Sequence, residues 1–198
     1  MAPQALSNCL LACAQLKDYA PKALQIVPAI VGEIPAKLQG MNPQEMSNSL
    51  ETLVLLRHSV PQVGGMDDIL MSAAARLNSL LPRLGGKDFS FTVPVVIWAC
   101  AKAGVYDGEL LGAVATHLGS RTKLSALTRF GVCALSWSYQ VLDAQDDFED
   151  FKTLLMSEAE RRGFSEADVE GCHRGRLRWN RASGISLVEN PALYDRTS

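Results

Sequence analysis

The chain has 198 residues, of which 47% are hydrophobic and 20% are charged, and its formal net charge is −2. This composition excludes an intrinsically disordered chain, and the length allows a full hydrophobic core without disulfides or metals. The slightly acidic balance argues against a strongly basic protein that binds nucleic acid over its whole surface. The longest uninterrupted apolar stretch, residues 93–101, is far shorter than the roughly 20 residues of a membrane span, so we expect no transmembrane segment.

The five cysteines are an odd number and lie mostly within apolar helical patterns. Their spacing is not that of a secreted disulfide framework, which favours a reducing compartment. Cys9 and Cys13 lie four residues apart and could supply half of a metal site, but the histidines are distant in sequence. We therefore interpret the two thiols as core residues and expect neither a metal nor another cofactor. The first residues resemble neither a secretory signal nor a transit peptide.

Apolar residues in helical spacing recur along the chain, beginning with a repeated hexapeptide. Residues 3–8 (PQALSN) return as residues 43–48 (PQEMSN), 40 residues later. Each copy leads into an apolar run with the i, i+3, i+4, i+7 spacing of a buried helical face, and weaker runs cover residues 93–103 and 128–138. We expect each run to be the first helix of a pair. The positions that we take as equivalent in the four runs are Leu10, Leu50, Ile97 and Val132.

A second apolar segment follows each run and is bounded by glycines or other helix breakers, which predicts helix-turn-helix units. The clearest start signal is Asn42 with Pro43 and Glu45, a cap followed by an N1 proline and an N3 acid. Ser165 and Asp168 form a similar capping signal for a terminal helix. The second helices are expected at residues 26–38, 66–84, 109–118 and 148–162, and the terminal helix at residues 166–180.

Strand signals are almost absent, because no segment sustains an alternation of apolar and polar residues between turns. The sequence therefore predicts an all-α protein, in the form of an α-solenoid of stacked helix-turn-helix repeats of about 40 residues. Residues 1–181 should form the array, with about four helix pairs and a terminal helix, and residues 182–198 an extended or disordered tail. Residues 1–14 lack the polar outer face of a terminal repeat, so we expect further repeats or a partner surface on that side.

The repeated segment resembles a known class of helical repeats. The pattern Pro-Gln-x-Leu-x-Asn, followed by a run of Leu or Trp with Ala, is similar to the first helix of octotricopeptide repeats and to the helical repeats that precede RAP domains in organellar proteins. Residues 3–16, 43–56 and 98–102 carry the likeness. The resemblance implies a non-enzymatic protein of the mitochondrion or plastid that binds single-stranded or ribosomal RNA. Its role would be in transcript processing, stability, translation or ribosome association.

On this interpretation, polar residues on the exposed face of each first helix would contact RNA bases, one base per repeat. Ser7, Asn8, Ser47 and Asn48 occupy the matching positions. An Asn amide suits the task because it both donates to and accepts from a base edge. The alternative is that these residues only satisfy backbone N–H groups in the first helical turn.

An arginine-rich segment near the C-terminus is the second candidate for RNA contact. It combines cationic charge for phosphates with Trp179 as a ring on which a base could stack. The alternatives are a solvated charged face and docking on an acidic protein. The arginines concerned are Arg174, Arg176, Arg178 and Arg181.

Two hypotheses on function follow, and neither is enzymatic. The chain contains no nucleophile elbow, dinucleotide-binding glycine motif, phosphate loop or zinc-protease motif. Cys172 beside His173 suggests a nucleophile with its base, but adjacent side chains diverge on a helix. The acids within residues 143–150 are placed to start a helix and not to bind calcium. We expect an organellar RNA-binding repeat protein or, alternatively, a protein-binding scaffold or accessory subunit of a ribosomal, respiratory or photosynthetic assembly.

Overall fold

The computed structural model describes residues 1–61, 63–143 and 146–175, and within these ranges every regular element is a helix. The prediction of an all-α protein is confirmed. Four long helices correspond to the apolar runs of the sequence, and they are α1 (Pro3–Leu16), α3 (Pro43–Leu56), α5 (Gly86–Ala103) and α8 (Arg129–Leu142). The helices that follow them are α2 (Val27–Lys37), α4 (Met66–Leu80), α6 (Gly108–Leu118) and α9 (Glu149–Arg161).

The remaining elements are short, and several were not predicted. The helix α7 (Arg121–Ser125) lies between α6 and α8, and α10 (Glu166–Gly171) follows α9. Four 3₁₀ turns extend or join the α-helices: η1 (Pro21–Ile26), η2 (Leu38–Gly40), η3 (Leu81–Arg83) and η4 (Cys172–Arg174). A single turn of helix leaves no periodic signal in a sequence, so these elements could not be read from apolar spacing.

Helix starts agree with the capping signals of the sequence. The Asn42 side chain accepts the backbone N–H of Glu45 at 2.8 Å, and the Glu45 carboxylate accepts the N–H of Asn42 at 2.8 Å. The same reciprocal arrangement joins Ser165 and Asp168 at the start of α10. Each pair satisfies two backbone donors that the first helical turn cannot satisfy itself. Both predicted capping boxes are confirmed.

The terminal helix is shorter than predicted. We expected it over residues 166–180, but α10 ends at Gly171, and η4 carries the chain to Gly175. Gly175 has φ 84° and ψ 158°, a conformation that is almost restricted to glycine and that ends the helix. A Cβ on this residue would lie 3.1 Å from the Leu55 side chain and 3.4 Å from Trp98, so the chain leaves η4 against α3 and α5. The predicted tail and its boundary at residue 181 lie outside the described residues.

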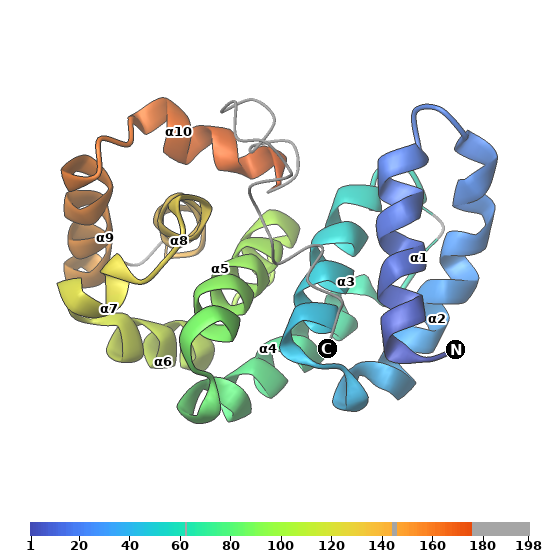
Figure 1. Cartoon of the computed structure of the whole chain (residues 1–198), viewed down its shortest axis with the longest axis horizontal. Coiled ribbons are helices and arrows are strands. Elements are labelled where there is room, and N and C mark those ends of the chain that lie inside the picture. The colour runs from blue at the N-terminus through green and yellow to red at the C-terminus, as the bar shows by residue number, and fades with distance from the viewer. Residues whose placement is uncertain (62, 144–145, 176–198) are drawn as a thin grey trace.

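The long helices pack in chain order, with α1 against α3, α3 against α5 and α5 against α8. Figure 1 shows α1 and α3 side by side, α5 tilted beside them and α8 viewed almost along its axis, so that the direction of the helices turns along the row. The following helices form a second layer, in which α2 contacts α1 and α4, α4 contacts α5 and α6, and α9 contacts α8. Together the elements form the crescent of Figure 1.

The core runs through the whole described part of the molecule. The four positions taken as equivalent, one in each long helix, are at most 1% exposed. Trp98 and Tyr139 are the largest fully buried side chains, and each has its polar atom satisfied. The Trp98 indole N–H donates to the Cys172 carbonyl at 2.9 Å, and the Tyr139 hydroxyl donates to the Leu111 carbonyl at 2.7 Å. Trp98 is therefore a packing residue. Among the described helices, none is long and apolar enough to cross a bilayer.

Candidate functional site

Three of the four polar residues proposed to read bases are not on an exposed face. Ser7 is 2% exposed, Ser47 is fully buried and Asn48 is 9% exposed, while Asn8 is half-buried. The expectation that these residues face solvent is wrong for all but Asn8, because α1 packs against α3, and α3 packs against both α1 and α5. The Ser47 hydroxyl donates to the Gln44 carbonyl at 3.1 Å, so this residue does not cap the helix either. The cap of α3 is Asn42.

The structure describes one of the four candidate arginines. Arg174 is exposed at the end of η4, and its guanidinium donates to the Gly171 carbonyl at 3.2 Å. Arg176, Arg178 and Arg181, like Trp179, lie outside the described residues.

The cysteines have the environment of core residues. Four of the five thiols are buried, and Cys9 is half-buried. Burial raises the pKa of the Cys100 and Cys133 thiols to about 12, which disfavours the thiolate needed for nucleophilic or metal-binding chemistry. Cys172 points into the core and donates to the Cys133 carbonyl at 3.4 Å, while His173 is exposed. The structure does not bring this thiol and imidazole together, and the described residues contain no cluster of possible metal ligands.

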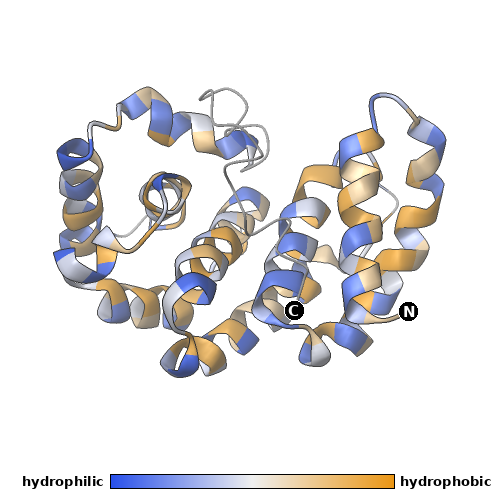
Figure 2. Ribbon diagram, viewed as in Figure 1, coloured by the Kyte–Doolittle hydropathy of each residue, from blue (hydrophilic) through white to orange (hydrophobic). Residues whose placement is uncertain are grey.

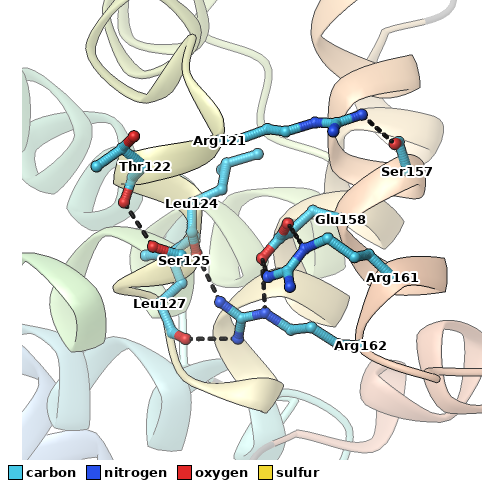
Figure 3. Close-up of polar contacts among 9 residues, drawn as sticks. All are labelled: Arg121, Thr122, Leu124, Ser125, Leu127, Ser157, Glu158, Arg161 and Arg162. Atoms are coloured by element: carbon cyan, nitrogen blue, oxygen red, sulfur yellow. Dashed lines mark hydrogen bonds and ion pairs between the residues drawn. The ribbon is translucent and has the colours of Figure 1, made fainter.

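A buried carboxylate near the far end of the molecule belongs to a network that joins α9 to α7 and to the turn that follows α7 (Figure 3). Glu158 on α9 is 1% exposed and accepts two hydrogen bonds from Arg161, at 2.8 and 2.7 Å, and one from Arg162 at 2.7 Å. Arg162 also donates to the Leu127 and Leu124 carbonyls at 2.8 and 2.9 Å, which ties α9 to the end of α7 and the turn before α8. Hydrogen bonds from Arg161 and then Arg162 lower the pKa of Glu158 to about 2. This joint is a structural one, and sequence analysis did not find it.

The acids before α9 also have structural partners. Asp143 is 3% exposed and accepts the backbone N–H groups of Asp147 and Phe148, both at 2.9 Å. Lys152, one turn into α9, pairs with Asp143 at 3.3 Å and with Glu149 at 2.9 Å. These contacts agree with the interpretation of the segment as a helix start, because the carboxylates meet N–H donors and a cation and do not converge on an empty centre.

The outward side of α1 differs from the equivalent side of α3. No residue of α1 is charged, yet Ala5, Ala12 and Leu16 are exposed on one side of it, and Leu16 is 46% exposed. At the positions 40 residues later, Thr52 and Leu56 are at most 1% exposed. The side of α1 that is equivalent to this buried side of α3 is therefore exposed. We call this surface the α1 outer face and define it by Ala5, Cys9, Ala12 and Leu16.

A groove beside this end of the molecule is also partly apolar. Pro28 and Val31 of α2, Ile69 of α4 and the segment from residue 63 to residue 65 contribute to a cavity of about 400 Å³. Figure 2 shows hydrophobic segments along α2, whereas the ribbon of α9 at the other end is mostly hydrophilic. The two ends of the crescent thus differ in character, and the apolar end is the one formed by α1 and α2.

Comparison with protein-family models, curated proteins and solved structures finds no match for this chain. The functional assignment therefore rests on the surfaces described above.

Proposed function

We propose that this chain is an α-solenoid that serves as a protein-binding scaffold or accessory subunit, with the α1 outer face as its docking surface. The proposed solenoid is supported by the packing of α1, α3, α5 and α8 in chain order and by the 40-residue recurrence of the sequence. The observation that carries the function is the absence of charge on α1, combined with the exposure of one of its sides. A terminal repeat that met only water would carry a polar outer face.

The occupant that fits the α1 outer face is a helix pair of a partner subunit. In α3 the corresponding side is buried within the row of helices, so a helix placed on α1 would continue an interface that the molecule already forms. Ala5 and Ala12 have small side chains that allow another helix to approach closely, and Leu16 supplies apolar area. The resemblance to organellar repeat proteins favours an assembly of the mitochondrion or plastid.

The docking proposal is tested with Ala12→Glu, which places a charge at the centre of the face. The matched control is Ala75→Glu, on an exposed position of α4. Each variant is purified together with its native partners, and the amount of retained partner is measured. Cross-linking through Lys17 and Lys22, which are close to the face in sequence, identifies the partner helix that is bound there. We expect Ala12→Glu to lower the retained partner at least about tenfold, because an unpaired charge would be buried, and the control to retain it. Equal retention by both variants, or cross-links from the partner to other surfaces alone, would disprove the proposal.

RNA binding is the second candidate, favoured by the exposure of Arg174 at the start of the arginine-rich segment. Binding to a pool of single-stranded RNA is measured at several salt concentrations. Each phosphate contact contributes a slope of about −0.7 to the plot of log affinity against log salt. Arg174→Ala should make that slope shallower by about 0.7 if Arg174 contacts a phosphate. If the protein does not bind RNA, or binds it with an affinity that does not depend on salt, the RNA-binding candidate is contradicted and the scaffold function remains.

A further inference from the structure

Exposed apolar side chains are concentrated where α1 ends and the chain turns toward α2. Among the described residues, seven large apolar side chains are at least 44% exposed, and three of these lie within residues 16–26. They are Leu16, Tyr19 and Ile26, which are 46%, 88% and 51% exposed. Apolar groups that gather on a surface indicate a binding site, whereas single scattered ones do not. Leu16 belongs to the α1 outer face, and we define the α1–α2 tip by Lys17, Tyr19, Lys22 and Ile26.

The backbone of the tip is held in place, so the exposure of Tyr19 is a feature of the fold. The Leu16 carbonyl accepts the N–H groups of Tyr19 and Ala20 at 2.9 and 2.7 Å, which closes the turn after α1. The Cys13 thiol donates to the Ala23 carbonyl at 3.5 Å and ties η1 to α1. In the view of Figure 1, the link between α1 and α2 arches beyond the end of the neighbouring α3. The tip is therefore a projecting corner of the crescent.

Ile26 lies on the side of η1 that begins next to Tyr19. A 3₁₀-helix has three residues per turn, so Ala20, Ala23 and Ile26 share one side of η1. None of these side chains is polar, and Ala20 directly follows Tyr19 in the chain. The exposed ring and the exposed isoleucine are thus joined by small apolar residues.

The charges of this end of the molecule are also gathered at the tip. Residues 1–32 contain three charged side chains, which are Lys17, Asp18 and Lys22. Their balance is positive, whereas the whole chain has a formal net charge of −2. Lys22 is exposed, and Lys17 is half-buried. A molecule with this distribution of charge approaches a negatively charged surface with the tip foremost.

Apolar side chains interleaved with lysines match the surface of a lipid bilayer. A tyrosine has an apolar ring and a polar end, and it favours the zone where headgroups meet acyl chains. A lysine keeps its ammonium group among the headgroups while its methylene stem is covered, and anionic lipids attract it. A helix of a protein partner would need a face or a groove to pack along, but the tip is a projecting corner. These features favour an anionic bilayer as the occupant.

We propose that the α1–α2 tip is a peripheral membrane-binding element. Tyr19 and Ile26 enter the interfacial zone of a bilayer that contains anionic lipids, and Lys17 and Lys22 lie among the headgroups. The contact goes beyond the proposed scaffold function and uses a different surface, since the α1 outer face stays available to a protein partner. It would hold the scaffold at a membrane surface.

Co-sedimentation of the full chain with lipid vesicles tests the charge part of the proposal. The vesicles consist of phosphatidylcholine alone or with about 30% phosphatidylserine. We expect the wild-type protein to bind the anionic vesicles at least about fivefold more tightly, and this difference to shrink as salt is raised. Lys22→Gln should lower the affinity for anionic vesicles about fivefold. The matched control is Lys87→Gln, at an exposed position of α5, which should bind as the wild type does.

The same assay tests the apolar part with Tyr19. Tyr19→Ser should lower the affinity for anionic vesicles at least about fivefold, because the ring no longer leaves water on binding. Tyr19→Trp should retain binding, since Trp favours the same interfacial zone. The matched control is Tyr106→Ser, in the link between α5 and α6, where the ring is 49% exposed. It should bind the vesicles as tightly as the wild type.

Several outcomes would overturn the proposal. One is a wild-type protein that does not bind the anionic vesicles, and another is an equal loss in Tyr19→Ser and Tyr106→Ser. If Tyr19→Ser weakens the retention of a protein partner but not the binding of vesicles, the tip is a protein contact and not a membrane contact. Loss of folding does not confuse these results, because Tyr19 is 88% exposed and urea denaturation of each variant verifies its stability.

Discussion

Glu158 illustrates at the scale of one residue how charge is used inside this molecule. Its carboxylate is buried and receives hydrogen bonds from Arg161 and Arg162, and Arg162 continues to two backbone carbonyls before α8. The cation thus satisfies both an acid and the open end of a short helix. Because Arg161 is half-exposed, the stabilisation is smaller than that of a fully buried pair.

We predict that Glu158→Gln lowers the free energy of unfolding by on the order of 2 kcal/mol, measured by urea denaturation. The loss arises because Arg162 remains largely buried without its counter-charge. Glu160→Gln, which changes the charge equally at an exposed position, should alter stability by less than about 0.5 kcal/mol. A similar loss in both variants would indicate a general charge effect.

The same residue predicts a pH dependence. The pKa of Glu158 is lowered to about 2 in the folded protein, against about 4.3 for an unperturbed Glu. A lowered folded-state pKa stabilises the fold above pH about 4.3, and this stabilisation is lost progressively as the pH falls toward about 2. The difference in stability between wild type and Glu158→Gln should therefore shrink over this window, as urea melts at successive pH values would show. A difference that stays constant would contradict the assigned ion pair.

At the scale of an element, the helices begin where local hydrogen bonding favours them and end where the backbone changes. The capping boxes at Asn42 and Ser165 start α3 and α10, and Gly104, with φ 74°, follows the end of α5. These features depend on residues within a few positions of one another, so they are visible in the sequence. Arg76 of α4, which binds carbonyls just after α2, makes a long-range contact instead of a local one. Arg76 donates to the Leu38 and Met41 carbonyls, more than 30 positions away, and no local pattern indicates it.

We predict that Asn42→Ala destabilises the protein by about 1 kcal/mol and increases hydrogen exchange in the first turn of α3. The substitution removes the side-chain oxygen that accepts the Glu45 N–H. It also weakens the reciprocal bond from the Asn42 N–H to the Glu45 carboxylate, which depends on the same geometry. Gln39→Ala, at an exposed position just before the same helix, is the control. Unchanged exchange of residues 44–46 in Asn42→Ala would mean that the capping box does not stabilise the start of α3.

At the scale of the whole molecule, the packing of each long helix on the next makes stability a shared property. Leu50 lies in the core of α3, which contacts both α1 and α5. A cavity there removes contacts within the continuous core, whereas Leu16, on the α1 outer face, is 46% exposed and has fewer such contacts to lose. Mutations in the middle of the crescent should therefore lower stability more than mutations on the α1 outer face.

We predict that Leu50→Ala lowers the free energy of unfolding by about 2–5 kcal/mol, as expected for a fully buried leucine. Leu16→Ala, on the α1 outer face, should cost less than about 1 kcal/mol because the side chain is 46% exposed. Chemical denaturation of both variants provides the comparison. An equal cost at the two positions would contradict the burial difference on which the docking proposal depends.

Helix class, most helix starts and the buried stripe of each long helix were determined by the sequence, because 3.6-residue spacing and capping act over a few residues. Tertiary structure decided which polar residues are covered. Ser47 and Asn48 are polar residues near the start of a helix, yet neighbouring packing buries them. Glu158, Arg161 and Arg162 have the sequence of an ordinary charged helix surface, but Glu158 is buried and Arg162 binds carbonyls of α7 and of the turn that follows it. Such burial depends on contacts between residues far apart in the chain, which helical periodicity does not encode.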